Sequence, residues 1–296
     1  MTHDSHSFEY DVASALAKGA RTRQEDALAV AFADGAPDGF AILSDGMGGH
    51  VGGDLASRAI VTEVFAALTL DEVARRSVPP VALRRAVSRA NDGLQACVTS
   101  NPERAGMGGT LVAAHVADGA VHWASVGDSV LYLFRNQTLA RLNADHSMAP
   151  QLDLMAANGS ITEAEAAAHP QRNCLTAALT GDAIAEVDCP EAPLDLKPED
   201  ILILASDGLQ FLPDPIIEAL LLRARNESSR AIARDLLDAL ETLNDPEQDN
   251  TSLVVIRPVR TKSRERQSSL LQTSSAMFKA VRRAVAPTVH IDPKGS

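Results

Sequence analysis

Three short apolar segments separated by tight turns place the strongest constraint on how this chain folds. The segments are residues 110–116, 121–126 and 130–134, and each has the composition of a β-strand. Because only a few residues connect them, neighbouring segments are expected to run antiparallel, as in a meander. The sequence therefore favours an antiparallel sheet over a parallel one, whose strands need long crossover connections.

The other predicted elements form clusters of strands and clusters of helices. Alternation at Val12, Ser14 and Leu16 predicts a half-buried strand near the N-terminus. Further strands are predicted at 27–33, 39–44, 201–205 and 252–256, and helices at 54–68, 80–98, 148–157, 213–224 and 228–243. This clustering favours a layered α+β fold over repeated βαβ units, within one continuous domain.

Composition makes some functions and locations unfavourable. The 296-residue chain carries a formal net charge of −12, whereas nucleic-acid binding relies on a basic surface. The polar N-terminus lacks the features of a signal peptide, and no apolar run approaches the ~20 residues of a transmembrane helix. The three cysteines, Cys97, Cys174 and Cys189, show no CxxC spacing and are predicted to be free, buried thiols. We therefore expect a cytoplasmic protein.

The C-terminal segment differs in charge from the rest of the chain. Residues 261–296 contain seven Lys or Arg against Glu265 and Asp292, a net charge of +5, which leaves −17 for residues 1–260. We predict one folded domain at 1–260 followed by a basic, Ser-rich tail at 261–296. The tail has two interpretations: a flexible segment, or an amphipathic helix that docks on a membrane surface or a partner.

Five short segments each place an aspartate beside glycine or another small or polar residue. They are Arg-Thr-Arg-Gln-Glu-Asp at 21–26, Ser-Asp-Gly-Met-Gly-Gly-His at 44–50, Gly-Asp-Ser at 127–129, Ser-Asp-Gly at 206–208 and Gln-Asp-Asn-Thr at 248–251. A single Asp-Gly pair indicates only a turn. Asp45 and Asp207, however, each follow a strongly apolar predicted strand, so their carboxylates can converge at one edge of a sheet. Clustered carboxylates repel one another, and hard cations such as Mg²⁺ or Mn²⁺ relieve that repulsion.

The glycine-rich loop at 46–53 has an alternative interpretation as a phosphate-binding loop of the nucleotide-binding kind. It contains no Gly-Lys-Ser/Thr sequence, and no lysine occurs between Lys18 and Lys197. It is better explained as a metal-binding turn that leads into the predicted helix 54–68.

In order along the chain, these segments resemble the motifs of the bacterial protein phosphatase 2C-like (PPM) family of metal-dependent serine/threonine phosphatases. Gly-Met-Gly-Gly-Thr at 106–110 and Asp-His-Ser at 145–147 add to the resemblance, which covers about residues 10–257. It implies a four-layer αββα sandwich: two antiparallel β-sheets flanked by helices, with metals in a cleft at one edge.

The resemblance also implies roles for the metal ligands. Asp45 would bridge two Mn²⁺ or Mg²⁺ ions, and the carbonyl of Gly46 would bind one of them. Asp207 and Asp249 would complete the shell of the first ion. Asp128, together with Asp207, would hold a weaker third ion.

Three further residues would complete the chemistry. Glu25 and Asp26 would act through coordinated waters or by supporting the residues that bind the metals. Arg21 would bind the substrate phosphate through its fork of donors. A metal-bridged hydroxide would attack phosphorus without a phosphoenzyme intermediate. Expected substrates are phosphoserine and phosphothreonine in proteins, made by an opposing kinase and hydrolysed by a monomeric enzyme.

Some positions depart from the family pattern. Met47 stands where some members have a histidine proposed as a general acid, so that acid is unassigned. His50 is expected to have a structural role, and Ala177 occupies a position where arginine is common. Two other functions stay open: a silent phosphoprotein-binding module, and a phosphatase for small phosphoesters. Because the four metal-binding aspartates are all present, a silent module is the less favoured of these.

Overall fold

The computed structural model describes residues 8–33, 36–48 and 52–260, and the strands in these residues form two antiparallel sheets. His50 and the tail at 261–296 lie outside the described residues. The five-stranded sheet has the order β1 (Phe8–Ala17), β11 (Thr251–Arg260), β10 (Ile201–Ala205), β7 (Val130–Arg135) and β8 (Thr138–Arg141). The six-stranded sheet has the order β2 (Asp26–Phe32), β3 (Gly39–Met47), β5 (Leu111–Ala117), β6 (Ala120–Val126) and β9 (Leu194–Asp195), with β4 (Gly108–Gly109) paired to β3.

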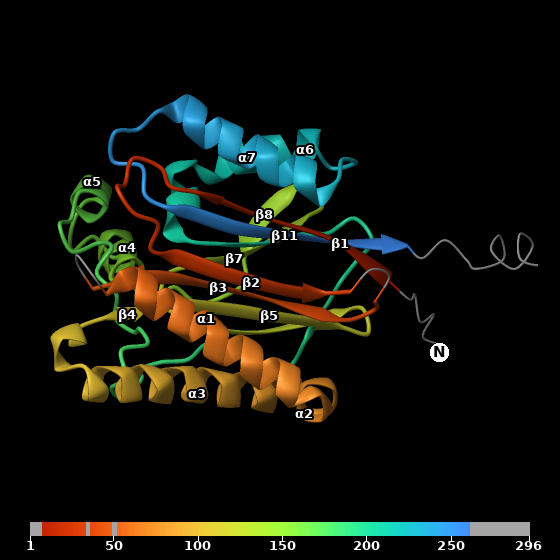
Figure 1. Cartoon of the computed structure of the whole chain (residues 1–296). Coiled ribbons are helices and arrows are strands. Elements are labelled where there is room, and N and C mark those ends of the chain that lie inside the picture. The colour runs from red at the N-terminus through yellow and green to blue at the C-terminus, as the bar shows by residue number, and fades with distance from the viewer. Residues whose placement is uncertain (1–7, 34–35, 49–51, 261–296) are drawn as a thin grey trace, which may run out of the picture. The chain divides into compact units, whose positions relative to one another are not determined.

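Helices cover the outer face of each sheet (Figure 1). The six-stranded sheet packs against α1 (Gly53–Leu70) and α3 (Pro79–Ser100), which α2 (Glu72–Ser77) connects. The five-stranded sheet packs against α6 (Asp214–Arg223) and α7 (Ser229–Leu243). The remaining helical segments are η2 (Pro102–Arg104), α4 (Ala149–Ala157), α5 (Glu163–Ala167) and η3 (Asp207–Phe211).

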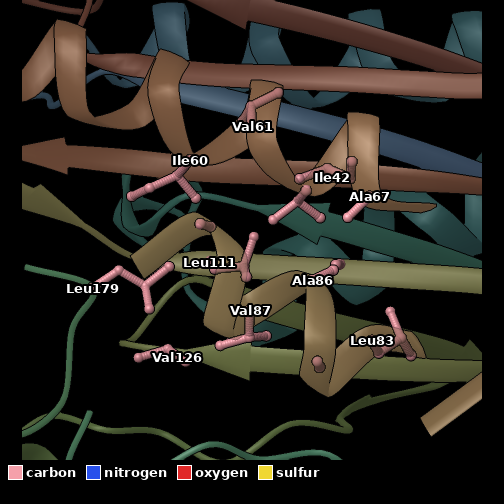
Figure 2. Close-up of a cluster of buried hydrophobic side chains, with 14 of the residues drawn as sticks. Ile42, Ile60, Val61, Ala67, Leu83, Ala86, Val87, Leu111, Val126 and Leu179 are labelled. Atoms are coloured by element: carbon pink, nitrogen blue, oxygen red, sulfur yellow. The ribbon is translucent and has the colours of Figure 1, made fainter. Parts of the chain in front are cut away.

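The two faces of each strand serve different apolar layers. In β3, Ile42 faces α1 and α3, whereas its neighbour Ala41 faces the other sheet. Figure 2 shows the helix-facing layer, where Ile42 and Leu111 meet side chains of both helices. Each fully buried Leu or Ile stabilises the fold by roughly 1.5–3 kcal/mol, so these layers account for much of its stability. The predicted four-layer αββα sandwich is confirmed.

The predicted meander is only half right. β5 and β6 pair antiparallel, but β7 pairs with β10 and β8, in the other sheet. Residues 127–129 therefore carry the chain from one sheet to the other. Gly127 permits this course because its φ is +99°, and a Cβ there would lie 2.6 Å from Thr110 Cγ2. A short turn between apolar strands cannot by itself distinguish a hairpin from a step between stacked sheets.

The cysteine prediction is also partly wrong. All three cysteines are free, as expected, and Cys189 is buried. Cys97 is only partly buried and Cys174 is exposed. Within the described residues, no helix combines the length and apolar character that crossing a membrane requires.

Candidate active site

Five aspartates from the ends of strands in both sheets meet at one edge of the sandwich. Asp26 begins β2, opposite Asp45 near the end of β3. Asp128 lies in the turn between β6 and β7, Asp207 lies two residues after the end of β10, and Asp249 precedes β11. The Asp45 carboxylate interacts electrostatically with the other four. The expected convergence is present, but it spans two sheets instead of the edge of one.

The mutual repulsion of these carboxylates is visible in their pKa values. Burial raises the pKa of Asp45 well above its ordinary value, and the neighbouring aspartates raise it further. Burial likewise raises the pKa of Asp26 to about 6 and that of Asp128 to about 7, with Asp207 adding to both. The pKa of Asp207 is also raised, by burial first and then by Asp249. The cluster therefore disfavours its own ionisation unless a positive charge is supplied.

Several carboxylate oxygens have no hydrogen-bond donor. Asp26 Oδ2 accepts from Ser206 Oγ at 2.8 Å, but Asp26 Oδ1 and Asp207 Oδ1 are buried without a partner among the described residues. Buried, unpartnered oxygens of this kind are costly in a folded protein unless a ligand satisfies them.

The backbone around Gly46 is packed closely against the start of α1. Gly46 N donates to Glu25 O at 3.2 Å, and a Cβ on Gly46 would collide with the carbonyl oxygen of Gly53. Only glycine fits this position, which keeps the peptide beside Asp45 and the Glu25 segment.

Arg21 lies on a loop that Asn250 holds in place. Asn250 Nδ2 donates to Lys18 O at 2.8 Å and to Arg23 O at 2.9 Å, while its Oδ1 accepts from Glu25 N at 2.7 Å. Arg21 itself is 57% exposed and forms a 2.5 Å ion pair with Asp249 Oδ2. The loop thus brings a guanidinium group to the border of the acidic cluster.

A cavity of about 590 Å³ opens beside the cluster, and Asp45, Asp128 and Asp207 line it. The segment 173–178, which includes Ala177 and the exposed Cys174, forms another wall. A larger cavity of about 1160 Å³ lies between β1 and α7, but none of the five aspartates lines it. We therefore place the candidate site in the smaller cavity, where the unbalanced charge is.

Hard cations fit the donors that the chain presents here. The set consists of carboxylate oxygens together with the backbone oxygen of Gly46, which is the chemistry that Mg²⁺ and Mn²⁺ prefer. Across residues 8–33, 36–48 and 52–260, no three His, Cys, Asp or Glu side chains already form a ligand group for one ion.

The sequence motifs include Thr110, Ser206 and Asp145, but sequence reasoning did not predict that they and Arg141 hold the aspartates in place. Thr110 Oγ1 accepts from Asp45 N at 2.9 Å, and Ser206 Oγ donates to Asp26. Arg141 Nη2 donates to Asp128 O at 2.8 Å, and its Nη1 pairs with Asp145 Oδ2 at 2.8 Å. The four-residue spacing of Arg141 and Asp145 is the one local signal that could have indicated such a pair.

Known proteins share this arrangement of elements. The family model of protein phosphatase 2C matches residues 14–255. The serine/threonine phosphatase stp of Listeria welshimeri is 34% identical over 232 residues, which cover 76% of this chain and 86% of that protein.

Solved structures agree with the sequence relatives. Serine/threonine phosphatase Stp1 from Staphylococcus aureus superimposes with a TM-score of 0.72 at 26% identity, covering 87% of this chain and 98% of that one. The catalytic domain of the serine/threonine protein phosphatase PstP, solved in complex with two manganese ions, gives 0.67 at 28% identity, covering 85% and 99%. With its two-sheet sandwich, its acidic edge and a match over most of its length, the chain belongs to the protein phosphatase 2C family.

Proposed function

We propose that this chain is a protein-serine/threonine phosphatase that depends on Mn²⁺ or Mg²⁺ and acts in the cavity beside the five aspartates. The observation that carries the proposal is the meeting of buried, mutually repelling carboxylates with unpartnered oxygens at one edge of the sandwich. The relatives named serine/threonine phosphatases support the same activity, and the manganese-bound relative supports the cofactor.

In this proposal the metal ligands come from both sheets. Asp45, the backbone oxygen of Gly46, Asp207 and Asp249 would hold two ions, with Asp45 shared by both and Asp207 and Asp249 binding the first. Asp128 together with Asp207 would hold a weaker third ion. When bound, divalent cations lower the pKa of a coordinated water towards neutrality and offset charge on a phosphoryl group.

The remaining residues act on waters and on the substrate. Asp26 and Glu25 would accept hydrogen bonds from waters bound to the ions and orient them. Arg21 binds the equatorial oxygens of the phosphate. To reach the Arg21 guanidinium, the phosphate must compete with Asp249, which pairs with it. Because no side chain of the site is assigned as a nucleophile, the proposed hydrolysis is direct, without a phosphoenzyme.

Phosphoproteins made by an opposing serine/threonine kinase are the proposed substrates, and the enzyme is proposed to act as a monomer. The free state of all three cysteines in the described residues supports a cytoplasmic location. We also propose that residues 1–260 form the phosphatase domain and that the basic tail at 261–296, if it docks on a partner or membrane, is not needed for the chemistry.

The first experiment measures hydrolysis of a phosphothreonine peptide with Mn²⁺, with Mg²⁺ and with EDTA. Wild-type protein should turn over only with the cation, and Asp207→Asn should not. Asp92→Asn, which changes an exposed carboxylate on α3, is the matched control and should behave like wild type. A 1–260 truncation should retain full turnover.

Two outcomes would change the proposal. If folded, metal-loaded wild-type protein hydrolyses neither the peptide nor a small phosphoester, the chain is a phosphoprotein-binding module. If it hydrolyses the small phosphoester but not the peptide, the substrate class is wrong while the metal chemistry stands.

A further inference from the structure

Asp45 depends on the side chain of Thr110, which lies at the break between β4 and β5. Thr110 N donates to Asp45 O at 2.8 Å, as in an ordinary ladder. The return bond differs, because Asp45 N donates to Thr110 Oγ1 at 2.9 Å while the Thr110 carbonyl accepts from Ser44 Oγ at 2.7 Å. The threonine hydroxyl therefore takes the place of a backbone carbonyl beside the central aspartate of the site.

The same hydroxyl reaches the turn that carries Asp128. Thr110 Oγ1 and Ser129 Oγ share a hydrogen bond of 2.7 Å, and the two residues are only 3% and 1% exposed. On the other flank of Asp128, a Cβ at Gly127 would meet Thr110 Cγ2. Thr110 thus contacts the turn both before and after Asp128.

Asn143 fixes Ser129 from the opposite side. Asn143 Nδ2 donates to Ser129 O at 2.9 Å and to Ser125 Oγ at 3.2 Å, and its Oδ1 accepts from Leu131 N at 2.7 Å. Because Asn143 is also buried, any displacement of Ser129 would break several hydrogen bonds that water cannot replace.

We propose that Thr110 and Ser129 are positioning residues that set the spacing between the carboxylates of Asp45 and Asp128. Asp45 lies near the end of β3 in the six-stranded sheet, whereas Asp128 lies on the step to the five-stranded sheet. The Thr110–Ser129 hydrogen bond is the direct polar link between the two segments. The proposal rests on the proposed function, since the spacing of the two carboxylates sets the geometry in which the metal ions and the phosphate are held.

The test compares three single variants in the full chain. Thr110→Val keeps the shape and removes the hydroxyl, Thr110→Ser keeps the hydroxyl, and Ser129→Ala removes its partner. Ser229→Ala is the matched control: Ser229 is buried, and its hydroxyl donates to Asp11 O at 2.7 Å on the α7 side of the molecule. Each protein is titrated with Mn²⁺ by calorimetry, melted in EDTA, and assayed for kcat and KM on a small phosphoester.

Thr110→Val should weaken Mn²⁺ binding and lower kcat by about 10–100-fold each, the usual effect of removing an outer hydrogen bond from a metal site, with KM little changed. Thr110→Ser should restore most of both. Ser129→Ala should have a smaller effect of the same kind, because Asp45 N keeps its acceptor. The double variant Thr110→Val with Ser129→Ala should be no worse than Thr110→Val alone, since both changes delete one shared bond.

The proposal is overturned if Thr110→Val binds Mn²⁺ and turns over like wild type, or if Thr110→Ser is as impaired as Thr110→Val. Equal losses in Ser229→Ala would also refute it, because they would indicate general destabilisation. Should Thr110→Val fail to fold, wild-type Mn²⁺ binding by Ser129→Ala overturns the proposal instead. If wild-type protein neither binds Mn²⁺ nor hydrolyses phosphoesters, the proposed function fails, which is a separate result.

Discussion

The two ends of β3 each place an aspartate at the border of the interior, but in opposite environments. At the β4 end, Asp45 faces four other aspartates. At the α2 end, Asp38 accepts from Arg75 Nη1 at 3.2 Å and from Arg76 Nη2 at 3.2 Å. The same strand therefore joins a cluster of uncompensated acids to a compensated ion-pair network.

The α2 end has the features of a purely structural cluster. Arg75 also donates to Leu68 O at 3.0 Å, lies within 2.9 Å of His115 Nε2, and places its guanidinium 5.2 Å from the centre of the Phe40 ring. The Arg75 guanidinium is thus surrounded by interaction partners. An acid that a basic partner balances holds a helix to a sheet, whereas acids left unbalanced are the ones available to a ligand.

The largest expected effect comes from Asp45→Asn. Turnover should fall by about 10²–10³-fold, as when a central electrostatic contact of an active site is lost. The melting temperature in EDTA should not fall and is expected to rise, because one repelling carboxylate is gone. Activity assays and melts in EDTA check both. A lower melting temperature would show that Asp45 has stabilising partners, which would break the contrast with Asp38.

The next effect concerns stability at the other end of the strand. Asp38→Ala leaves Arg75, whose side chain is 9% exposed, without its carboxylate. Unfolding free energy should drop by about 3 kcal/mol, while kcat of the folded enzyme is unchanged. Denaturant titration measures the drop. Glu72→Ala is the control, because it removes an exposed ion pair to Arg76 and should cost less than about 1 kcal/mol.

The third effect is a difference in pH dependence, which is absent near neutral pH. Burial, followed by the charge of Arg75, lowers the pKa of His115 to about 4, and further charges nearby belong to Asp38, Arg76 and His122. The unfolded chain takes up a proton on His115 near pH 6.5, whereas the folded chain does so only near pH 4. The stability that depends on a neutral His115 is therefore complete above pH 6.5 and is lost as the pH falls towards 4. The loss reaches at most about 3 kcal/mol.

Comparison of wild type with His115→Gln by denaturant titration between pH 4 and 8 isolates this contribution. At the end of β3 that carries Asp45, stability depends on pH in the opposite direction. The raised pKa of Asp26, about 6, gives a contribution in EDTA that is present below pH 4 and is lost as the pH rises through 6. If His115→Gln showed the same low-pH loss as wild type, another group would be responsible.

The sequence predicted the aspartates because apolar strands end where the chain reaches the edge of a sheet. Asp45 and Asp207 follow runs of buried residues, and that pattern is local. It could not predict Thr110 or Asn250, since each bonds a segment distant in sequence: Thr110 lies 65 residues from Asp45, and Asn250 lies 225 residues from Glu25.

As with the site, the parts of the fold that were predicted are those with a local pattern in the sequence. Strands and helices with long apolar patterns were located within a few residues. The prediction missed α2, α5, β4, β8 and β9, which are short and carry little apolar periodicity. It also placed β6 and β7 in one sheet, because a turn of three residues carries no information about which sheet the next strand joins.

The step of residues 127–129 between the sheets has a consequence for how this fold can fail. A slip of one sheet past the other by a single residue, about 3.3 Å, would separate Asp45 from Asp207 and Asp249 while leaving every strand and helix intact. A change in the alignment of the two sheets would therefore be detected as a loss of catalytic activity, whereas the secondary structure would not change. Substitutions among the apolar side chains between the sheets, such as Val112 and Leu131, can inactivate the enzyme from a distance.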